Sequence, residues 1–160
     1  AIFYARGVLE TVKKLRWCPD VIHCHGWVSA LIPIYIKTAY REEPSFRDSR
    51  VVYSMYKDDF HNNLKENFTQ QLLIKDMTDN LLEGIQKPVN ASELNKLAIQ
   101  YSDGLIQGDP DIYPELLEYA EGLGIPTLTY QGEENYAESF CNFYDQIWSV
   151  GKEEEEEEED

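Results

Sequence analysis

The chain has 160 residues, and 42% of them are apolar, which is enough for one domain with an ordinary core. Thirty Asp and Glu residues face 14 Lys and Arg residues, for a formal net charge of −16. This charge argues against a protein that binds duplex nucleic acid, which needs a basic surface, and against docking on anionic membranes. No apolar run approaches the roughly 20 residues that span a bilayer. We therefore expect no nucleic acid and no membrane among the partners of this protein.

The two ends of the chain differ in character. Ala1 opens a segment with helical spacing and is not an initiator Met, so we expect the chain to be a piece of a longer protein. Residues 153–160 are all acidic, and we expect a disordered acidic tail at residues 151–160 after a folded part at residues 1–150.

The three cysteines have no CxxC spacing, which indicates free thiols in a reducing compartment. We therefore expect a cytoplasmic protein without a metal site.

The first part of the chain predicts two buried strands among helices. Apolar residues at helical spacing indicate a helix over residues 2–16. A short apolar run at residues 21–25 predicts a buried strand, Gly26 predicts a turn, and residues 27–38 predict the next helix. Residues 51–56 are rich in β-branched and aromatic side chains and predict the second strand.

The rest of the chain repeats this alternation after a long polar excursion. Residues 57–89 show weak periodicity, which predicts one or two short helices in the most mobile internal segment. The later elements are a helix at residues 90–101 capped by Asn90, a strand at residues 104–108, a helix that begins at Asp109 and Pro110, a strand at residues 125–130 and a helix at residues 133–148.

Short buried strands that alternate with amphipathic helices predict an α/β fold. We expect a Rossmann-like, doubly wound parallel sheet with helices on both faces. Ligands of such sheets bind beyond the carboxyl ends of the strands. The residues at those ends lie at positions 25–27, 55–57, 108–110 and 131–132. We therefore expect any chemistry among these four places.

Two histidines and a tryptophan lie near the first of these strand ends. We expect His23 and His25 to point to opposite faces of their strand, with His23 as a buried, hydrogen-bonded imidazole. His25 lies nearer to the end of the strand and is the better site candidate. Trp27 has two interpretations, which are core packing under the next helix and an indole face against a sugar ring.

The sequence offers no motif of a familiar catalytic or cofactor site. It contains no GxGxxG, GxSxG or HExxH pattern and no Walker-type phosphate loop, so we expect no cofactor. Asp58 and Asp59 fit a solvated turn better than acid–base catalysis. Asp109 is expected to cap the helix that Pro110 begins.

Three runs of the sequence carry a family resemblance. Residues 17–27 read WCPDVIHCHGW, residues 30–35 read ALIPIY, and residues 96–104 read KLAIQYSDG. With these runs, residues 1–120 resemble bacterial glycogen synthases and plant starch synthases, most specifically at residues 17–35.

The resemblance implies a retaining glycosyltransferase of the GT-B type, built from two Rossmann-like domains. This chain would be part of the amino-terminal domain, with the first strands of that domain before residue 1. Active members of the family transfer glucose from ADP-glucose to the non-reducing end of an α-1,4-glucan. The partners implied by the resemblance are therefore an α-glucan acceptor, ADP-glucose and a separate carboxy-terminal domain that holds most of the donor.

Three positions depart from the family pattern. Gly26 stands where the family's His-x-His-Asp-Trp motif has Asp, and the family's catalytic His falls on Met55. Asp109 stands where the family has the Ser of Val-Ser-Pro. We therefore assign no catalytic residue in this chain.

The resemblance leaves more than one function open. The chain is the acceptor-side domain of a glycogen-synthase-like glucosyltransferase in glycogen biosynthesis, or it is a non-catalytic relative that binds glucan or a partner protein. A third interpretation is an interaction domain with no carbohydrate role. Whether the protein is an enzyme stays undecided, and we expect no transfer by this chain alone. The residues expected to bind substrate are His25, Trp27 and Tyr56.

Overall fold

Four parallel strands form the sheet in the part of the chain that the structure describes. The computed structural model describes residues 1–57, 63–134 and 136–158, without the side chains of residues 151–158. The strands β1 (Val21–His25), β2 (Arg50–Met55), β3 (Gly104–Gln107) and β4 (Thr127–Leu128) lie in the order β1–β2–β3–β4. Every neighbouring pair is parallel, which confirms the predicted α/β fold with a parallel sheet.

Helices flank and connect the strands. The α-helices are α1 (Ile2–Lys14), α2 (Ile32–Lys37), α3 (Phe68–Leu72), α4 (Ala91–Gln100), α5 (Pro114–Gly122) and α6 (Tyr136–Glu158), and the short 3₁₀ helices are η1 (Trp27–Ser29) and η2 (Asp79–Leu82). The segment that the sequence predicts as one helix at residues 27–38 is therefore split into η1 and α2. Pro33 lies in the first turn of α2, where its missing N–H costs no helical hydrogen bond.

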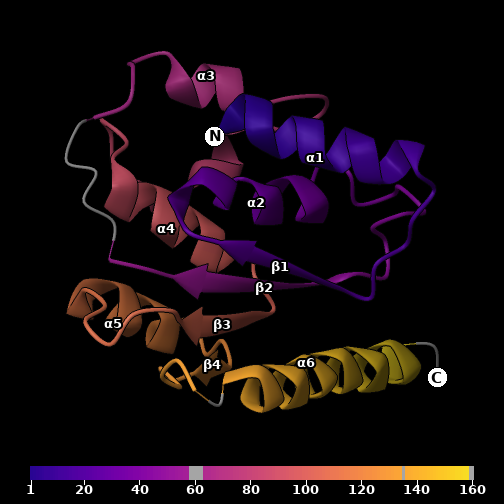
Figure 1. Ribbon diagram of the computed structural model, residues 1–160. Coiled ribbons are helices and arrows are strands. Elements are labelled where there is room, and N and C mark those ends of the chain that lie inside the picture. Colours follow the sequence, from indigo (N-terminus) through magenta and orange to yellow (C-terminus); the bar gives the residue numbers. More distant parts are fainter. Residues whose placement is uncertain (58–62, 135, 159–160) are drawn as a thin grey trace.

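The helices cover both faces of the sheet. Figure 1 shows α1 and α2 on one side of the strands and α6 on the other. The main core cluster contains Leu9 of α1, Ile34 of α2 and Leu94 of α4, all of them almost fully buried against the sheet. A second, smaller cluster lies under α6 and consists of Val52, Ile106, Phe143 and Ile147.

Strand β2 separates these two clusters because successive side chains of a strand point to opposite faces. Tyr53 and Met55 belong to the main core, whereas Val52 belongs to the cluster under α6. All residues from Val51 to Met55 are buried, as expected for a central strand covered on both faces. This central position explains why the sequence of β2 is an almost continuous apolar run.

A glycine in β3 allows α6 to lie close to the sheet. A Cβ atom built on Gly104 would lie 2.8 Å from Cδ1 of Ile147 and 3.0 Å from the Phe143 ring. Helix α6 therefore packs directly on the backbone of β3, and its aromatic side chains reach the residues of β1 and β2 beside it.

The sequence predicts one or two short helices at residues 57–89, and the described part of this segment contains two, α3 and η2. Phe68, Leu72 and Leu82 are buried in the main core cluster. Asp58 and Asp59 lie outside the described residues, so the solvated turn expected at these two residues remains a prediction. Asn90 caps α4 as predicted, because its Oδ1 accepts a hydrogen bond of 3.0 Å from the backbone N–H of Glu93.

Helix α6 continues to Glu158 and thus enters the segment for which the sequence predicts an acidic tail. The domain boundary at residue 150 and the disorder beyond it remain predictions. No described helix, α6 included, is long and apolar enough to cross a membrane.

Candidate functional site

The carboxyl ends of β1 and β2 bring His25 and Tyr56 together. His25 is the last residue of β1, and Tyr56 directly follows β2. The Nδ1 atom of His25 lies 3.0 Å from the Tyr56 hydroxyl, and the two rings are stacked with their centroids 6.2 Å apart. His25 is exposed and Tyr56 is partly buried. The expected site at the strand ends therefore contains an imidazole and a phenol in direct contact.

His23 and His25 lie on the same face of β1, so the expectation of opposite faces is wrong. Their ring centroids are 3.9 Å apart, with an interplanar angle of 30°. The physical reason is the two-residue period of a strand, which places residues i and i+2 on one face and only i and i+1 on opposite faces. Both imidazoles therefore face the side of the sheet that α6 covers.

Both ring nitrogens of His23 form hydrogen bonds. Its Nδ1 lies 2.7 Å from the Tyr144 hydroxyl of α6, and its Nε2 lies 2.7 Å from Oγ of Ser54 in β2. Burial, helped by the nearby His25, lowers the pKa of His23 to about 4. The structure confirms that the His23 imidazole is hydrogen-bonded, although its side chain is only partly buried rather than buried as expected. The low pKa makes His23 neutral near pH 7.

The pKa of His25 is also lowered, and the cause is burial of part of its ring. Burial raises the pKa of the Tyr56 phenol, a hydrogen bond with Ser54 opposes this rise, and the Asp109 carboxylate adds to it. At neutral pH the pair therefore consists of an uncharged imidazole and an uncharged phenol. Such a pair offers hydrogen-bond donors and acceptors without charge.

Gly108, at the end of β3, makes room for the Tyr56 ring. A Cβ atom at position 108 would lie 2.5 Å from Cε1 of Tyr56 and 2.9 Å from the Met55 carbonyl oxygen. The backbone N–H of Gly108 also donates a 2.8 Å hydrogen bond to that carbonyl. Only glycine fits here, so Gly108 is part of what positions Tyr56.

The remaining residues singled out from the sequence lie around this pair. Gly26 adopts φ 65° in the turn after β1, and its N–H donates to the Ser54 carbonyl oxygen at 3.1 Å. Trp27 lies in η1 and is half-buried against the main core. Met55 is fully buried in that core, on the face of the sheet away from His25. Met55 therefore lies away from His25, whereas the next residue, Tyr56, contacts that histidine directly after the end of β2.

Asp109 does not cap a helix, which corrects the expectation from the sequence. Helix α5 begins at Pro114 and has Tyr113 at its N-cap position. The Asp109 carboxylate instead accepts a 2.8 Å hydrogen bond from the backbone N–H of Lys57. It thereby ties the loop after β3 to the loop after β2. The competing proline at position 114 starts the helix four residues later than Pro110 would.

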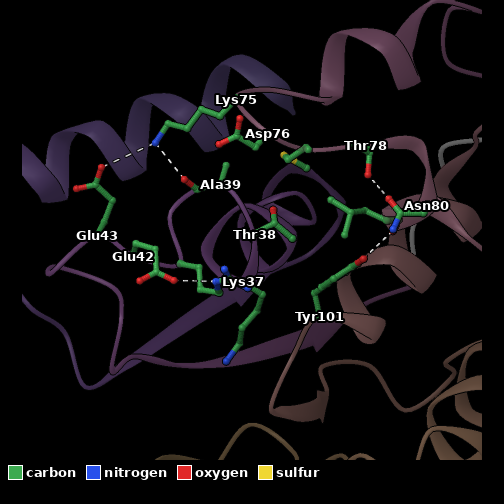
Figure 2. A pocket seen from close by; sticks show the side chains of 13 residues that line it. Lys37, Thr38, Ala39, Glu42, Glu43, Lys75, Asp76, Thr78, Asn80 and Tyr101 are labelled. Carbon is green, nitrogen blue, oxygen red and sulfur yellow. Dashed lines mark hydrogen bonds and ion pairs between the residues drawn. The ribbon is translucent and has the colours of Figure 1, made fainter.

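A cavity lies elsewhere, between the end of α2 and the segment that leads into η2. It has a volume of about 660 Å³, and Figure 2 shows its charged lining. Lys75 donates to the Ala39 carbonyl oxygen at 3.0 Å, and Lys37 pairs with Asp103 at 2.7 Å. Asp103 precedes β3, so this cavity lies near the amino ends of the strands. Because ligands of parallel α/β sheets bind at the opposite ends, we place the candidate site at His25 and Tyr56.

The sequence indicates His25 and Tyr56 as site residues and places position 108 at a strand end, but it does not point to Ser54 or Tyr144. Ser54 lies within an otherwise apolar strand. A polar residue at such a position indicates a buried hydrogen bond, and this is the signal that could identify Ser54. Tyr144 is one of several aromatic residues in the last helix, and its sequence position alone indicates no more than packing. Among the described residues, no group of three His, Cys, Asp or Glu side chains is arranged to hold a metal ion.

The chain is similar to known starch and glycogen synthases. The model of the family described as "Starch synthase catalytic domain" matches residues 1–129. A glycogen synthase of Clostridium perfringens is 32% identical over 104 residues, which are 65% of this chain and 21% of that protein. A glycogen synthase of Pelodictyon phaeoclathratiforme is 47% identical over 55 residues, which are 34% of this chain and 11% of that protein.

One solved structure shares the fold. The catalytic domain of starch synthase IV from Arabidopsis thaliana, bound to ADP and acarbose, matches 79% of this chain and 28% of its own length with a TM-score of 0.58. The sequence identity is 16%, so this likeness concerns the fold alone. The chain spans only 11% to 21% of the length of the two bacterial relatives.

Proposed function

Because the chain belongs to the starch synthase catalytic domain family, we propose that the carboxyl edge of its sheet binds an α-1,4-glucan in glycogen synthesis. The observation that carries the proposal is the contact of 3.0 Å between His25 and Tyr56 at the ends of β1 and β2. This is the edge at which parallel α/β sheets bind their ligands.

The chemistry of the pair suits a sugar. A phenol and an uncharged imidazole each keep hydrogen-bonding capacity beyond their mutual bond, and sugar hydroxyls both donate and accept. Trp27, two residues after His25, is the third proposed contact through its indole ring. His25, Trp27 and Tyr56 are thus the proposed glucan-binding residues.

We propose further that this chain does not transfer glucose by itself. Glucosyl transfer from ADP-glucose requires groups that stabilise charge on the leaving diphosphate. By the family resemblance, cationic residues of the carboxy-terminal domain hold the donor phosphates. Within this chain, Gly26 lacks the family's carboxylate, and Met55 is buried in the core with a thioether that cannot hydrogen-bond a glucosyl hydroxyl as an imidazole can. Loss of one positioned group commonly costs about 3 kcal/mol of transition-state stabilisation. In this proposal a separate carboxy-terminal domain holds ADP-glucose.

An assay of ADP release tests the proposed lack of transfer. The purified protein is incubated with ADP-glucose and glycogen, and ADP is measured over time. We expect no release above the rate without protein. Glycogen-dependent release by the purified chain would overturn this part of the proposal and would identify a rebuilt catalytic site.

Affinity electrophoresis in gels that contain glycogen tests the proposed binding. We expect glycogen to retard the wild-type protein, and we expect Tyr56→Phe and Trp27→Ala to reduce the affinity about three- to tenfold. The matched control is Tyr4→Phe, which removes a phenol hydroxyl from α1 at a side chain that is 48% exposed. Equal mobility of the wild type with and without glycogen would refute glucan binding.

The second candidate is a non-catalytic relative that binds glucan only. The observation that favours it is the burial of Met55, which places no polar group of that residue at the sheet edge. Mixing the purified chain with the carboxy-terminal domain of a bacterial glycogen synthase separates the two candidates. ADP release in the mixture favours the acceptor-side domain of an enzyme, and continued inactivity with intact glycogen binding favours the non-catalytic relative.

A further inference from the structure

Helix α6 begins at the edge of the sheet where His25 and Tyr56 lie. Strand β4 is parallel to β3, so its carboxyl end lies at the same edge as the carboxyl ends of the other strands. The chain enters α6 at Tyr136, soon after β4 ends, and Figure 1 shows the helix beginning beside β4 and then passing along the sheet. The first turn of α6 is therefore at the edge that carries the candidate site.

Ring contacts connect this first turn with the candidate site. The Tyr136 ring packs edge-on against Phe140 with the centroids 5.3 Å apart, and Phe140 packs edge-on against His23 at 5.7 Å. The His23 ring lies 3.9 Å from the His25 ring, which is stacked with Tyr56 at 6.2 Å. These five rings, from α6, β1 and the end of β2, form one continuous line that we call the aromatic row.

The spacing of residues in α6 separates the aromatic row from the core. Tyr136 and Phe140 are four residues apart and thus neighbours on one face of the helix. Phe143 and Ile147 are also four residues apart, and they are only 5% and 3% exposed in the cluster under α6. The helix therefore packs on the sheet with one pair of side chains and carries the other pair toward the candidate site.

Every ring of the aromatic row keeps some surface in contact with solvent. Tyr136 is 48% exposed, His25 is exposed, and Phe140, His23 and Tyr56 are partly buried. Within the described residues, the Tyr136 hydroxyl has no hydrogen-bond partner, and its ring contact with Phe140 is its interaction with the rest of the chain. Both the hydroxyl and half of the Tyr136 side chain are thus available to a ligand.

The length of the aromatic row suits a sugar chain better than a single sugar. A tyrosine combines an apolar ring with a hydroxyl that donates and accepts hydrogen bonds, as sugar hydroxyls do. Tyr136 and Tyr56 are separated by three other rings, so one glucose unit cannot contact both. Successive units of one chain can do so, and each further contact of a linked ligand raises the affinity as an intramolecular step.

We propose that α6 forms a second wall of the glucan site, in which Tyr136 contacts glucose units beyond the one held by His25 and Tyr56, so that the site prefers a glucan chain to a disaccharide. This inference rests on the proposed glucan binding and adds to it a further contact residue and a minimum length of the ligand. The family match ends at residue 129, so α6 lies outside the part of the chain that the family model describes.

Titration with short and long glucans tests this inference. The purified, ¹⁵N-labelled protein is titrated with maltose and with maltoheptaose, and ¹H–¹⁵N spectra report both the affinity and the residues whose signals move. We expect maltoheptaose to bind at least about tenfold more tightly than maltose. The amide signals of residues 136–140 should move with maltoheptaose and stay in place with maltose.

Variants separate a direct contact from an effect on packing. We expect Tyr136→Ala to weaken maltoheptaose binding about three- to tenfold and to leave maltose binding unchanged, whereas Tyr56→Phe should weaken both. Tyr136→Phe keeps the ring and should lose less than Tyr136→Ala, and it decides if the alanine variant fails to fold. The matched control is Tyr4→Ala in α1, because the Tyr4 side chain is also 48% exposed, and it should bind both sugars as the wild type does.

The outcomes distinguish this inference from the function on which it rests. If the wild type binds maltose and maltoheptaose equally, or if Tyr136→Ala binds maltoheptaose as the wild type does, the second wall is refuted and glucan binding stands. An equal loss for both sugars in Tyr136→Ala would show that Tyr136 acts through its packing on Phe140, which also refutes the direct contact. A wild type that binds neither sugar would refute the proposed function and this inference together.

Discussion

The Nδ1 atom of His25 lies 3.0 Å from the phenol oxygen of Tyr56, across the ends of two neighbouring parallel strands. The contact depends on the absence of a third side chain, because the Tyr56 ring occupies the space where a Cβ of Gly108 would be. The candidate site is therefore built from three adjacent strand ends. Its geometry can be disturbed without touching either of the two polar residues.

Gly108→Ala should reduce both stability and glycogen binding. The added Cβ would lie 2.5 Å from the Tyr56 ring and 2.9 Å from the Met55 carbonyl, which is backbone and cannot move freely. Overpacking of this kind costs about 1 to 3 kcal/mol of the free energy of unfolding. Urea denaturation measures this cost, and affinity electrophoresis measures binding.

The matched control is Gly7→Ala in α1, where a Cβ atom meets nothing within 4 Å. Alanine is favoured over glycine inside a helix, so this variant should be more stable than the wild type by about 0.5 to 1 kcal/mol. Equal stability of the two variants would show that the space around Gly108 is not limiting.

The contrast between Met55 and Tyr56 shows how far the sequence determines the site. The strand at residues 51–56 follows from its apolar and β-branched side chains, and its parallel pairing follows from the alternation with helices. Which of two consecutive residues faces the site depends on the register with the neighbouring strands, and a run that is buried on both faces does not reveal it. The three-dimensional structure is needed to place Met55 in the core and Tyr56 beside His25.

The pH dependence of the free energy of unfolding should reveal the low pKa of His23. The pKa of His23 is about 4 in the folded chain and about 6.5 in the unfolded chain. The unfolded chain therefore binds more protons between these values, so the free energy of unfolding falls as the pH falls from about 6.5 to about 4. His23 should contribute about 2 kcal/mol to this loss, with allowance for its partial exposure.

His23→Gln isolates this contribution, since glutamine does not titrate and carboxylates affect both proteins equally. Urea denaturation at pH 7 and pH 4.5 should show a smaller loss of stability for the variant than for the wild type. Parallel pH profiles of the two proteins would contradict the low pKa of His23.

Lys96 should matter more to stability than an exposed basic residue does. Its ammonium group lies 3.2 Å from Glu93, and the two side chains are only 12% and 6% exposed. Lys96→Met leaves the buried carboxylate without its cation, which should cost about 2 to 3 kcal/mol. The control Arg41→Met breaks a pair with Glu42 whose side chains are 73% and 82% exposed, and it should change stability by less than about 0.5 kcal/mol. Thermal denaturation of both variants checks this order.

Residues 63–89 should exchange their amide protons faster than β2. This segment has only two short helices, α3 and η2, whereas the amides of β2 are buried between two layers. Phe68 and Leu72 anchor it to the main core, so we expect intermediate protection near these residues. Hydrogen exchange measured by mass spectrometry tests this, and protection throughout the segment equal to that of β2 would contradict it.

Asp109 shows a second limit of prediction from sequence. An Asp-Pro pair is a good helix start, and the sequence offers one at residues 109–110 and another proline at position 114. The choice between them depends on a tertiary hydrogen bond, because the Asp109 carboxylate is engaged by the Lys57 N–H. A partner that lies 52 residues away in the chain cannot be read from local propensities.

The order of the strands in the sheet, β1–β2–β3–β4, is also their order in the chain. When β2, β3 and β4 leave the ribosome, each therefore finds its preceding neighbour already made, and none of these described strands has to insert between two earlier ones. Helix α6 follows all four strands in the chain and covers the face that carries His23 and Ser54. During synthesis these polar groups stay hydrated until Tyr144 arrives, so the hydrogen bond between His23 and Tyr144 forms only after the strands have been made.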